Sequence, residues 1–335
     1  MDASSSRRLG FPRRSSVAVL MLVAAALAAC VALVVAQEPA RATFPGENGD
    51  IAFVGRDADG THQIFTVSPS GENLRQLTFG KYPKASPAWS ADGSKIAFVE
   101  DRWDPRQGDI YTMDADGSDP AVLTSNRKDD ADPSWSPDGR RLVFSRQVTE
   151  DQPEIGVLGN RDLFIVNRNG SHSGLLRRTE VREDDPAWSP DGTKIAFSTF
   201  TPGDYEGYGR IHVMKADGSE LPKVLPHYFG GVGGLGWSPD GQWLAFSSAY
   251  PRGSSIIKVR ADGSEEPTGL IGGDAYGCVA VPDYYPSSPD WSPGGTQMVF
   301  ADSCSGLVTM DADGANVRSI FGGWVGQPSW QPVVR

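Results

Sequence analysis

The sequence contains few of the residues that hold metal ions, carry covalent catalysis or bind nucleic acids. Its 335 residues include 4 histidines and 3 cysteines. Lysine and arginine number 31 against 42 aspartates and glutamates, which gives a net charge of −11. Phosphate binding needs a concentrated basic surface, so this balance argues against a nucleic-acid partner. No Gly-x-Ser-x-Gly motif occurs, which argues against a hydrolase of the nucleophile-elbow type.

Long apolar runs are also absent, with one exception near the N-terminus. Val17–Ala36 is free of charge for 20 residues and follows a head with four arginines, so residues 1–36 predict a targeting segment. Three interpretations stay open: a cleaved secretory signal, a lipoprotein signal lipidated at Cys30, and a retained membrane anchor. The anchor is possible because 20 helical residues at about 1.5 Å each just span a bilayer core. All three predict an exported protein, located in the periplasm, in the cell envelope or outside the cell. The segment carries four arginines and one aspartate, net +3, so the remainder has a net charge of −11 − 3 = −14.

A tryptophan motif recurs along the rest of the chain. Six copies lie 39 to 54 residues apart, and five of them have a proline two residues before the tryptophan. A tight turn such as Pro137-Asp138-Gly139 follows most copies. A period in this range with several strands per unit is typical of a propeller or another repeat array. The six tryptophans are Trp89, Trp135, Trp188, Trp237, Trp291 and Trp330.

One repeat unit, Asp132 to Thr179, illustrates the expected strands. Turn residues separate four short runs of strand character, and Asn169-Gly170 predicts a tight hairpin between the last two. Four antiparallel strands of this kind make one propeller blade. The four expected strands are Pro133–Ser136, Arg141–Ser145, Asp162–Val166 and Gly174–Arg178.

The first unit lacks the tryptophan strand and begins at its second strand, Asp50–Val54. The missing strand is expected at the other end of the chain, in Gln327–Val334. Five complete units and this divided one predict an all-β, six-bladed β-propeller of four-stranded antiparallel blades over residues 44–335, after a linker at 37–43. Pairing of the C-terminal strand with the first blade would close the ring.

The repeat also resembles a known family. Trp135-Ser136-Pro137-Asp138-Gly139 with Leu142-Val143-Phe144, which recurs from Trp188 and from Trp237, resembles the TolB-type, WD-like propeller repeat. The resemblance covers about residues 44–335 and implies the propeller fold. TolB carries an α/β domain ahead of its propeller, and Ala36 to Asp50 leaves no room for one. The resemblance therefore does not imply a role in a Tol–Pal complex.

The candidate binding site is expected on the face that carries the long loops, here called the top face. These loops join the second to the third strand of a blade, and one blade to the next. Acidic residues gather where the first strands of blades 3 and 4 begin. They predict a site for a cation, a basic peptide or a polyhydroxyl ligand. The competing interpretation is that these residues only cap loop amides and contact water. Top-loop aromatic side chains would form an apolar rim. The candidate residues are Asp130, Asp132, Glu183 and Asp185 for the acidic core, and Trp103, Tyr205 and Tyr208 for the rim.

These observations favour a non-catalytic binding or scaffold propeller that recognises a protein, peptide or glycan in the cell envelope. The alternative is a metal-assisted polysaccharide hydrolase or lyase with its site at the channel mouth. The four histidines are spread over different loops and strands, so a histidine-rich metal centre is not expected. No cofactor is expected, although a divalent cation such as Ca²⁺ at the channel mouth stays open. The protein is expected to be a monomer whose membrane contact is limited to the N-terminal segment.

The cysteines predict a disulfide in the last blade. Cys278 lies in the loop that leads into this blade, and Cys304 lies in the loop between its second and third strands. Both loops open on the top face, and a compartment outside the cytoplasm permits disulfides. We therefore expect a Cys278–Cys304 bond.

Overall fold

The computed structural model describes residues 46–103, 106–149, 159–200, 208–220, 222–227, 229–248, 255–272 and 286–334. The regular elements within these ranges are all β-strands. The described part of the chain contains no helix with the length and apolar character needed to cross a bilayer.

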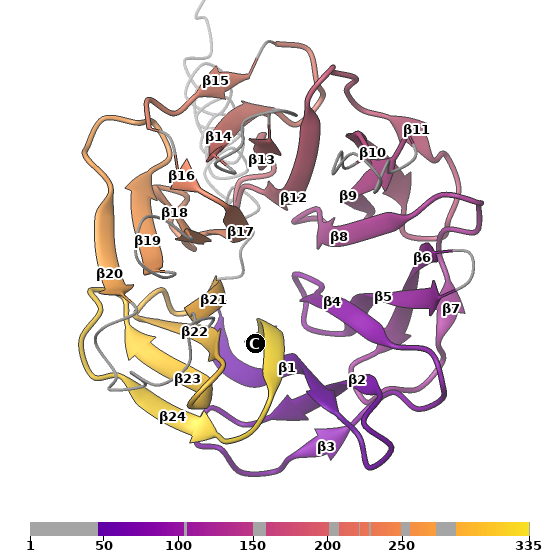
Figure 1. The fold of residues 1–335 in the computed structure, drawn as a ribbon, viewed down its shortest axis with the longest axis vertical. Helices are drawn as coiled ribbons and strands as arrows, with labels where there is room; N and C mark the ends of the chain where they lie inside the picture. The colour runs from indigo at the N-terminus through magenta and orange to yellow at the C-terminus, as the bar shows by residue number, and fades with distance from the viewer. Residues whose placement is uncertain are drawn as a thin grey trace, which may run out of the picture. The chain divides into compact units, whose positions relative to one another are not determined.

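The strands form six antiparallel sheets around a central axis, as Figure 1 shows. The innermost strands are β25 (Val325–Val333), β4 (Lys84–Trp89), β8 (Asp130–Trp135), β12 (Arg182–Trp188), β17 (Val232–Trp237) and β21 (Pro286–Trp291), in blades 1 to 6. The second strands are β1 (Glu47–Arg56), β5 (Lys95–Trp103), β9 (Arg141–Gln147), β13 (Lys194–Phe200), β18 (Trp243–Ser248) and β22 (Gln297–Asp302). The predicted all-β, six-bladed propeller is confirmed.

The outer half of each blade follows the same order. The third strands are β2 (His62–Val67), β6 (Arg106–Asp114), β10 (Arg161–Asn167), β14 (Tyr208–Lys215), β19 (Ser255–Arg260) and β23 (Gly306–Asp311). The outermost strands are β3 (Arg75–Gln76), β7 (Ala121–Val122), β11 (Gly174–Leu175), β15 (Lys223–Val224), β20 (Thr268–Gly272) and β24 (Arg318–Phe321). Blade 4 has an additional short strand, β16 (Phe229–Gly230), which pairs with β14.

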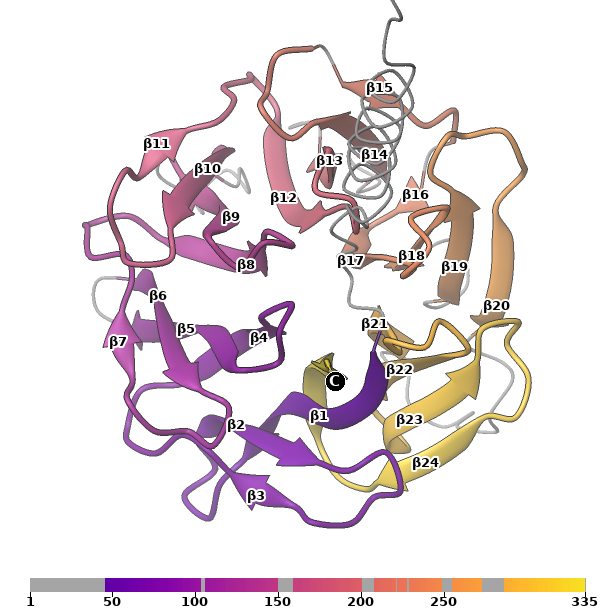
Figure 2. The same cartoon turned by 180° about the vertical axis from the view of Figure 1, so that it is seen from behind.

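The two ends of the propeller meet in blade 1. Strand β25 pairs antiparallel with β1, so that Trp330 lies opposite Ile51 and Ser329 opposite Ala52. Figure 2 shows the two strands, yellow and indigo, side by side from the opposite direction. The Trp330 side chain is 1% exposed, and its Nε1 donates a hydrogen bond to the Gly49 carbonyl at 3.1 Å. The predicted closure of the ring by the C-terminal strand is therefore confirmed.

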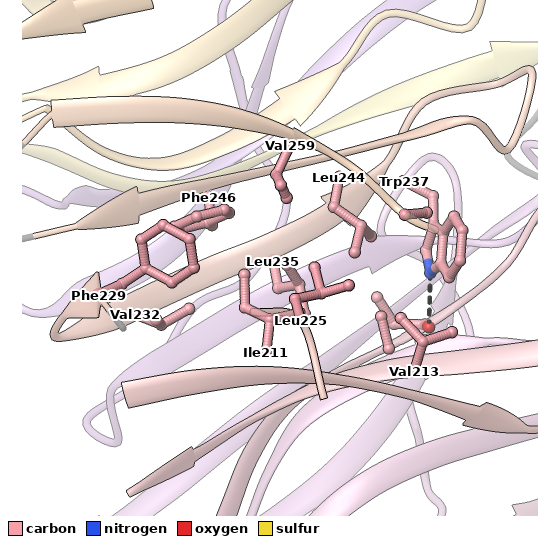
Figure 3. Close-up of a cluster of buried hydrophobic side chains, with 13 residues drawn as sticks. Ile211, Val213, Leu225, Phe229, Val232, Leu235, Trp237, Leu244, Phe246 and Val259 are labelled. Carbon is pink, nitrogen blue, oxygen red and sulfur yellow. Dashed lines mark hydrogen bonds between the residues drawn. The ribbon is translucent and has the colours of Figure 1, made fainter. Parts of the chain in front are cut away.

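The repeated tryptophans join each blade to the one before it. All six are buried, with exposed fractions of 1–5%. In Figure 3, Trp237 of blade 5 packs in a cluster with Ile211 and Leu225 of blade 4, and its Nε1 donates to the Ala187 carbonyl at 3.0 Å. A buried aromatic side chain removes about 150–250 Å² from water, so each tryptophan supplies much of the apolar contact between two blades.

The Pro-Asp-Gly turns form as expected and add a second contact between blades. In blade 3 the Asp138 Oδ1 accepts from the Ser136 hydroxyl at 2.6 Å and from the Arg140 N–H at 3.0 Å. The matching glycine of blade 4, Gly192, has a φ of 69°. A Cβ at Gly192 would lie 2.9 Å from Cγ of Pro137. Glycine is therefore required at this position both by the backbone conformation and by the neighbouring blade.

Several strand boundaries differ from the expectation by a few residues, and the two largest differences in blade 3 have a physical reason. The outermost strand of blade 3 covers only Gly174–Leu175, although Gly174–Arg178 was predicted. Short outer strands leave little unpaired edge for another chain to join, which is a common way to protect a sheet edge. The innermost strand of the same blade begins at Asp130, earlier than the predicted Pro133, because its first residues pair with β9 ahead of a bulge.

Candidate functional site

Each innermost strand contains a bulge near its start. In β8 the pairing with β9 shifts between Ala131 and Ser134, and the other five innermost strands show a shift at the matching place. One residue of each bulge takes the left-handed conformation, which five of the six adopt despite having a side chain. A bulge re-aims the side chain that it carries, here toward the central channel. The six bulge residues, with φ between 47° and 63°, are Ser86, Asp132, Asp185, Gly234, Ser288 and Gln327.

These six residues surround the channel and contact one another across the blades. The Gln327 Oε1 accepts from the Ser86 N–H at 2.8 Å, and its Nε2 donates to the Ser86 hydroxyl oxygen at 3.1 Å. The Ser86 hydroxyl in turn donates to Asp132 Oδ1 at 3.1 Å. On the other side the Asp185 Oδ1 accepts from the Gly234 N–H at 3.2 Å. The bulge residues therefore form a ring in which two carboxylates on adjacent blades, Asp132 and Asp185, stand next to each other.

The ring belongs to a central cavity of about 180 Å³ lined by the innermost strands of all six blades. Three carboxyl side chains line it, those of Asp132, Asp185 and Asp290. Within the described part of the chain, no lysine, arginine or histidine contributes to the lining. The charged side chains that line the cavity are therefore all acidic, and the nearest positive charges to Asp132, those of Arg161 and Arg182, lie outside the lining.

The two ring carboxylates hold their protons more tightly than usual. Burial raises the pKa of Asp132, and the neighbouring carboxylate of Asp184 raises it further. Burial also raises the pKa of Asp185 well above its ordinary value, and the charges of Asp132 and Asp184 add to this effect. A positive group placed between Asp132 and Asp185 would lower both pKa values and stabilise both charges.

Asp130, two residues before the bulge of β8, has a different environment. It is fully buried, and it accepts from Arg146 Nε at 2.6 Å, from Arg146 Nη2 at 2.7 Å and from Asn126 Nδ2 at 3.0 Å. Glu183 is placed in the same way in blade 4. It is also fully buried and accepts from Arg177 Nε at 3.2 Å, from the Thr179 hydroxyl at 3.1 Å and from the Leu163 N–H at 3.3 Å.

The structure thus divides the predicted acidic core into two pairs. Asp132 and Asp185 line the channel, whereas Asp130 and Glu183 are absent from its lining and are held by arginines within the blades. A carboxylate that is fully buried and already paired has no free oxygen to offer a partner. We therefore retain only Asp132 and Asp185 as candidate ligand-binding residues.

The predicted aromatic rim lies largely outside the described part of the chain. Trp103 is the last residue of β5 and Tyr208 the first of β14. Tyr205 falls outside the described residues, as do the side chains of Trp103 and Tyr208. Cys30, the predicted lipidation position, also lies outside them. The roles of these residues stay predictions.

The disulfide of the last blade can be tested directly. Cys304 is disulfide-bonded, and its expected partner Cys278 lies outside the described residues. A bond between them closes a loop of 26 residues, which corresponds to roughly 3–4 kcal/mol in the chain-entropy model. We expect mass spectrometry of the unreduced, digested protein to find the Cys278 and Cys304 peptides linked. Free thiols at both positions would contradict this pairing.

The sequence reasoning missed Asp290, the third carboxyl of the channel. It lies between Pro289 and Trp291, and it is the only ionisable residue at this position of the motif. The other copies have Ala88, Ser134, Ala187, Gly236 and Ser329. That exception is the signal that could have revealed it. No group of three or more histidine, cysteine, aspartate or glutamate side chains is placed to hold a metal ion within the described ranges.

Together the blades and the channel define a six-bladed propeller with an acidic central cavity. A family model described as the TolB beta propeller domain matches residues 35–158. This segment is therefore similar to the TolB beta propeller domain, as the resemblance implied for this part of the chain.

Individual relatives agree with this assignment. An uncharacterized protein of Agrobacterium fabrum is 31% identical over 161 residues, which are 43% of this chain and 50% of that protein. The Tol-Pal system protein TolB of Alcanivorax borkumensis is 34% identical over 86 residues, 25% of this chain and 19% of that protein. The crystal structure of TolB from Acinetobacter baumannii has a TM-score of 0.66 at 22% identity, and the match covers 87% of this chain and 69% of that one. The chain thus spans half the length or less of these curated relatives.

Proposed function

We propose that this protein is an exported binding or scaffold propeller that receives a positively charged group of its partner between Asp132 and Asp185. The observation that supports the proposal is the pair of adjacent ring carboxylates in a cavity whose described lining has no cation. The TolB-type repeat supports a binding role as well. We further propose that the partner is a protein or peptide of the cell envelope, because lysine and arginine side chains and chain amino termini supply the required charge.

The charge of the ring predicts how such binding depends on pH. Both carboxyl groups have raised pKa values, so they remain protonated to higher pH than exposed aspartates. A protonated carboxyl group attracts a cation far less than a carboxylate does. Binding is therefore expected to strengthen as the pH rises through their pKa values, with release of protons.

A double substitution tests the proposal. The variant Asp132→Asn, Asp185→Asn removes both charges with little change in volume, and it is expected to weaken capture of the partner at least about tenfold, since each lost charge-assisted contact contributes roughly 1.5–3 kcal/mol. The measurement is quantitative mass spectrometry of envelope proteins retained by the immobilised full chain, followed by titration with a lysine-rich peptide at pH 6 and pH 8.

A matched control changes two carboxylates on the opposite face. Asp217 and Asp262 are exposed hairpin residues, and blade 3 has Asn169 at the equivalent position. The variant Asp217→Asn, Asp262→Asn should keep full capture. If this control loses the partner while the ring variant retains it, the binding face is assigned wrongly. If the wild type captures no envelope protein but binds a polysaccharide when Ca²⁺ or Mn²⁺ is added, the result would favour the alternative, the metal-assisted enzyme.

A further inference from the structure

The residue directly before the motif tryptophan joins neighbouring blades near the channel in half of the ring. In three blades this residue accepts a hydrogen bond from the backbone N–H of the next blade's tryptophan. Ser134 does so from Trp188 at 3.2 Å and Ser329 from Trp89 at 3.3 Å. The third case is Asp290, whose Oδ2 accepts from the Trp330 N–H at 2.7 Å. Two blades therefore use a neutral hydroxyl group for a contact that blade 6 makes with a carboxyl group.

The blade 6 contact involves the strand that closes the ring, since β25 follows blade 6 directly in the chain and joins β1 of blade 1 only through strand pairing and packing. Trp330 belongs to β25, the strand that closes the propeller by pairing with β1. Asp290 accepts a second hydrogen bond from the N–H of its own neighbour, Trp291, at 2.9 Å. The carboxyl group thus holds the closing strand against blade 6 from the channel side.

Among the residues that the structure describes, no charged group is placed to offset the charge of Asp290. The strands that pack against β21 are β17, β18, β19, β22 and β25, of which β17, β18 and β25 carry no charged residue. On β19, Lys258 donates to the Ala312 carbonyl and Arg260 pairs with Glu265. On β22, Asp302 accepts from the N–H groups of Cys304 and Ser305. The only other charged groups in the described channel lining are the carboxyls of Asp132 and Asp185, which would repel a charge on Asp290.

We propose that Asp290 makes the closure of the propeller sensitive to pH, so that the ring is held most firmly when this carboxyl group is neutral and loosens when it is ionised. Desolvation in the channel disfavours the charge, while the two backbone N–H groups can bind either form. Ionisation therefore places an uncompensated charge at the junction between the first and last blades. The β25 strand is the element that can separate, because no peptide bond links it to blade 1.

The direction of the effect follows from the two states of the chain. Burial raises the pKa of Asp290 from 3.8 to about 7 in the folded protein, whereas the unfolded chain keeps the ordinary value. The stabilisation that this proton provides is complete below pH 3.8, decreases as the pH rises and is lost above about pH 7. Closure should therefore be firmer at pH 5 than at pH 8.

Hydrogen exchange of the β25 amides tests the proposal on the full chain. After correction for intrinsic exchange rates, we expect protection of residues 325–333 to fall at least about tenfold between pH 5 and pH 8, since most of the raised pKa is titrated in this window. The variant Asp290→Ser, which installs the residue found in blades 1 and 3, should remove this dependence. Equal protection at the two pH values in the wild type, or an unchanged dependence in Asp290→Ser, would overturn the proposal.

Two further measurements keep the test independent of one variant. Ser134→Asp introduces a carboxyl group at the equivalent position between blades 3 and 4, away from β25, so protection of β25 should stay as in the wild type. If Ser134→Asp instead made β25 protection fall further with pH than it does in the wild type, the effect would not be local to Asp290 and the proposal would be overturned. A carboxyl carbon NMR titration of the wild type should show Asp290 changing charge near pH 7, and a midpoint near pH 4 would overturn the proposal even if no variant folds.

Discussion

Replacing Trp330 with alanine is expected to lower the free energy of unfolding by about 3–5 kcal/mol, the range measured for large-to-small changes of buried aromatic residues. Trp330 is 1% exposed and packs in one cluster with Ile51 and Phe53 of blade 1 and Val299 and Leu307 of blade 6. The substitution would leave a cavity between the closing strand and blades 1 and 6. Because the native state of a domain is stable by only roughly 5–15 kcal/mol, this loss is a large fraction of the total.

Urea unfolding of the variant measures this effect, and Trp324→Ala provides the matched control. Trp324 lies just before β25 and is 42% exposed, stacked on the ring of His62 at 4.2 Å. Its replacement should cost clearly less than that of Trp330, because a much larger part of its side chain is already in contact with water. Deletion of residues 327–335 should lower the melting temperature sharply. A wild-type urea midpoint in Trp330→Ala would show that closure by β25 contributes little to the fold.

The closure strand could be predicted because the complete repeats show which strand the first unit lacks. Five complete motifs establish the order of strands in a blade, so the missing tryptophan strand of the first unit and the additional copy at Trp330 can be matched without any coordinates. The pairing of Gln327–Val334 beside Asp50–Val54 follows from this order, whereas the individual pairs, Trp330 with Ile51 among them, depend on two register shifts that only the structure shows. Apolar residues at regular positions determine this level of the fold, since their burial contributes most of the stability.

The division of the acidic residues could not be read in the same way. Asp130 and Asp132 are two residues apart, and in a regular strand such residues share one face. The bulge at Asp132, with a φ of 52°, breaks that alternation and turns Asp132 toward the channel. Asp130 remains against Arg146. A left-handed aspartate within a strand leaves no clear sign in a single sequence, so the two environments become distinct only in the structure.

For Asp290 the position in the strand could be predicted from the motif, but its charge state could not, because that depends on the groups that surround it. The sequence does not reveal that the neighbouring strands leave its charge without a counter-charge, because those strands come from blades 5, 6 and 1. Electrostatic properties of this kind depend on the desolvation of a group, which only the packed structure determines.

Replacing Arg146 with methionine is expected to destabilise the protein by about 3–5 kcal/mol at neutral pH, because breaking a buried ion pair leaves an uncompensated charge. Asp130 is fully buried, and Arg146 contacts both of its oxygens, at 2.6 and 2.7 Å. Methionine preserves much of the apolar contact that the arginine makes over the rings of Phe144 and Phe164. The loss of stability should therefore report the unpaired carboxylate and not a cavity.

Two comparisons separate the charge effect from packing, with stability measured by urea unfolding at neutral pH. Arg75→Met removes an arginine that is 51% exposed and 3.4 Å from Asp50, itself 31% exposed, and it should cost less than about 1 kcal/mol. The double variant Arg146→Met, Asp130→Leu removes both charges and should recover most of the stability lost in Arg146→Met, since well-packed apolar residues can replace a buried pair. No recovery in the double variant would mean that Arg146 acts through packing and that the Asp130 pair is not what holds β8 to β9.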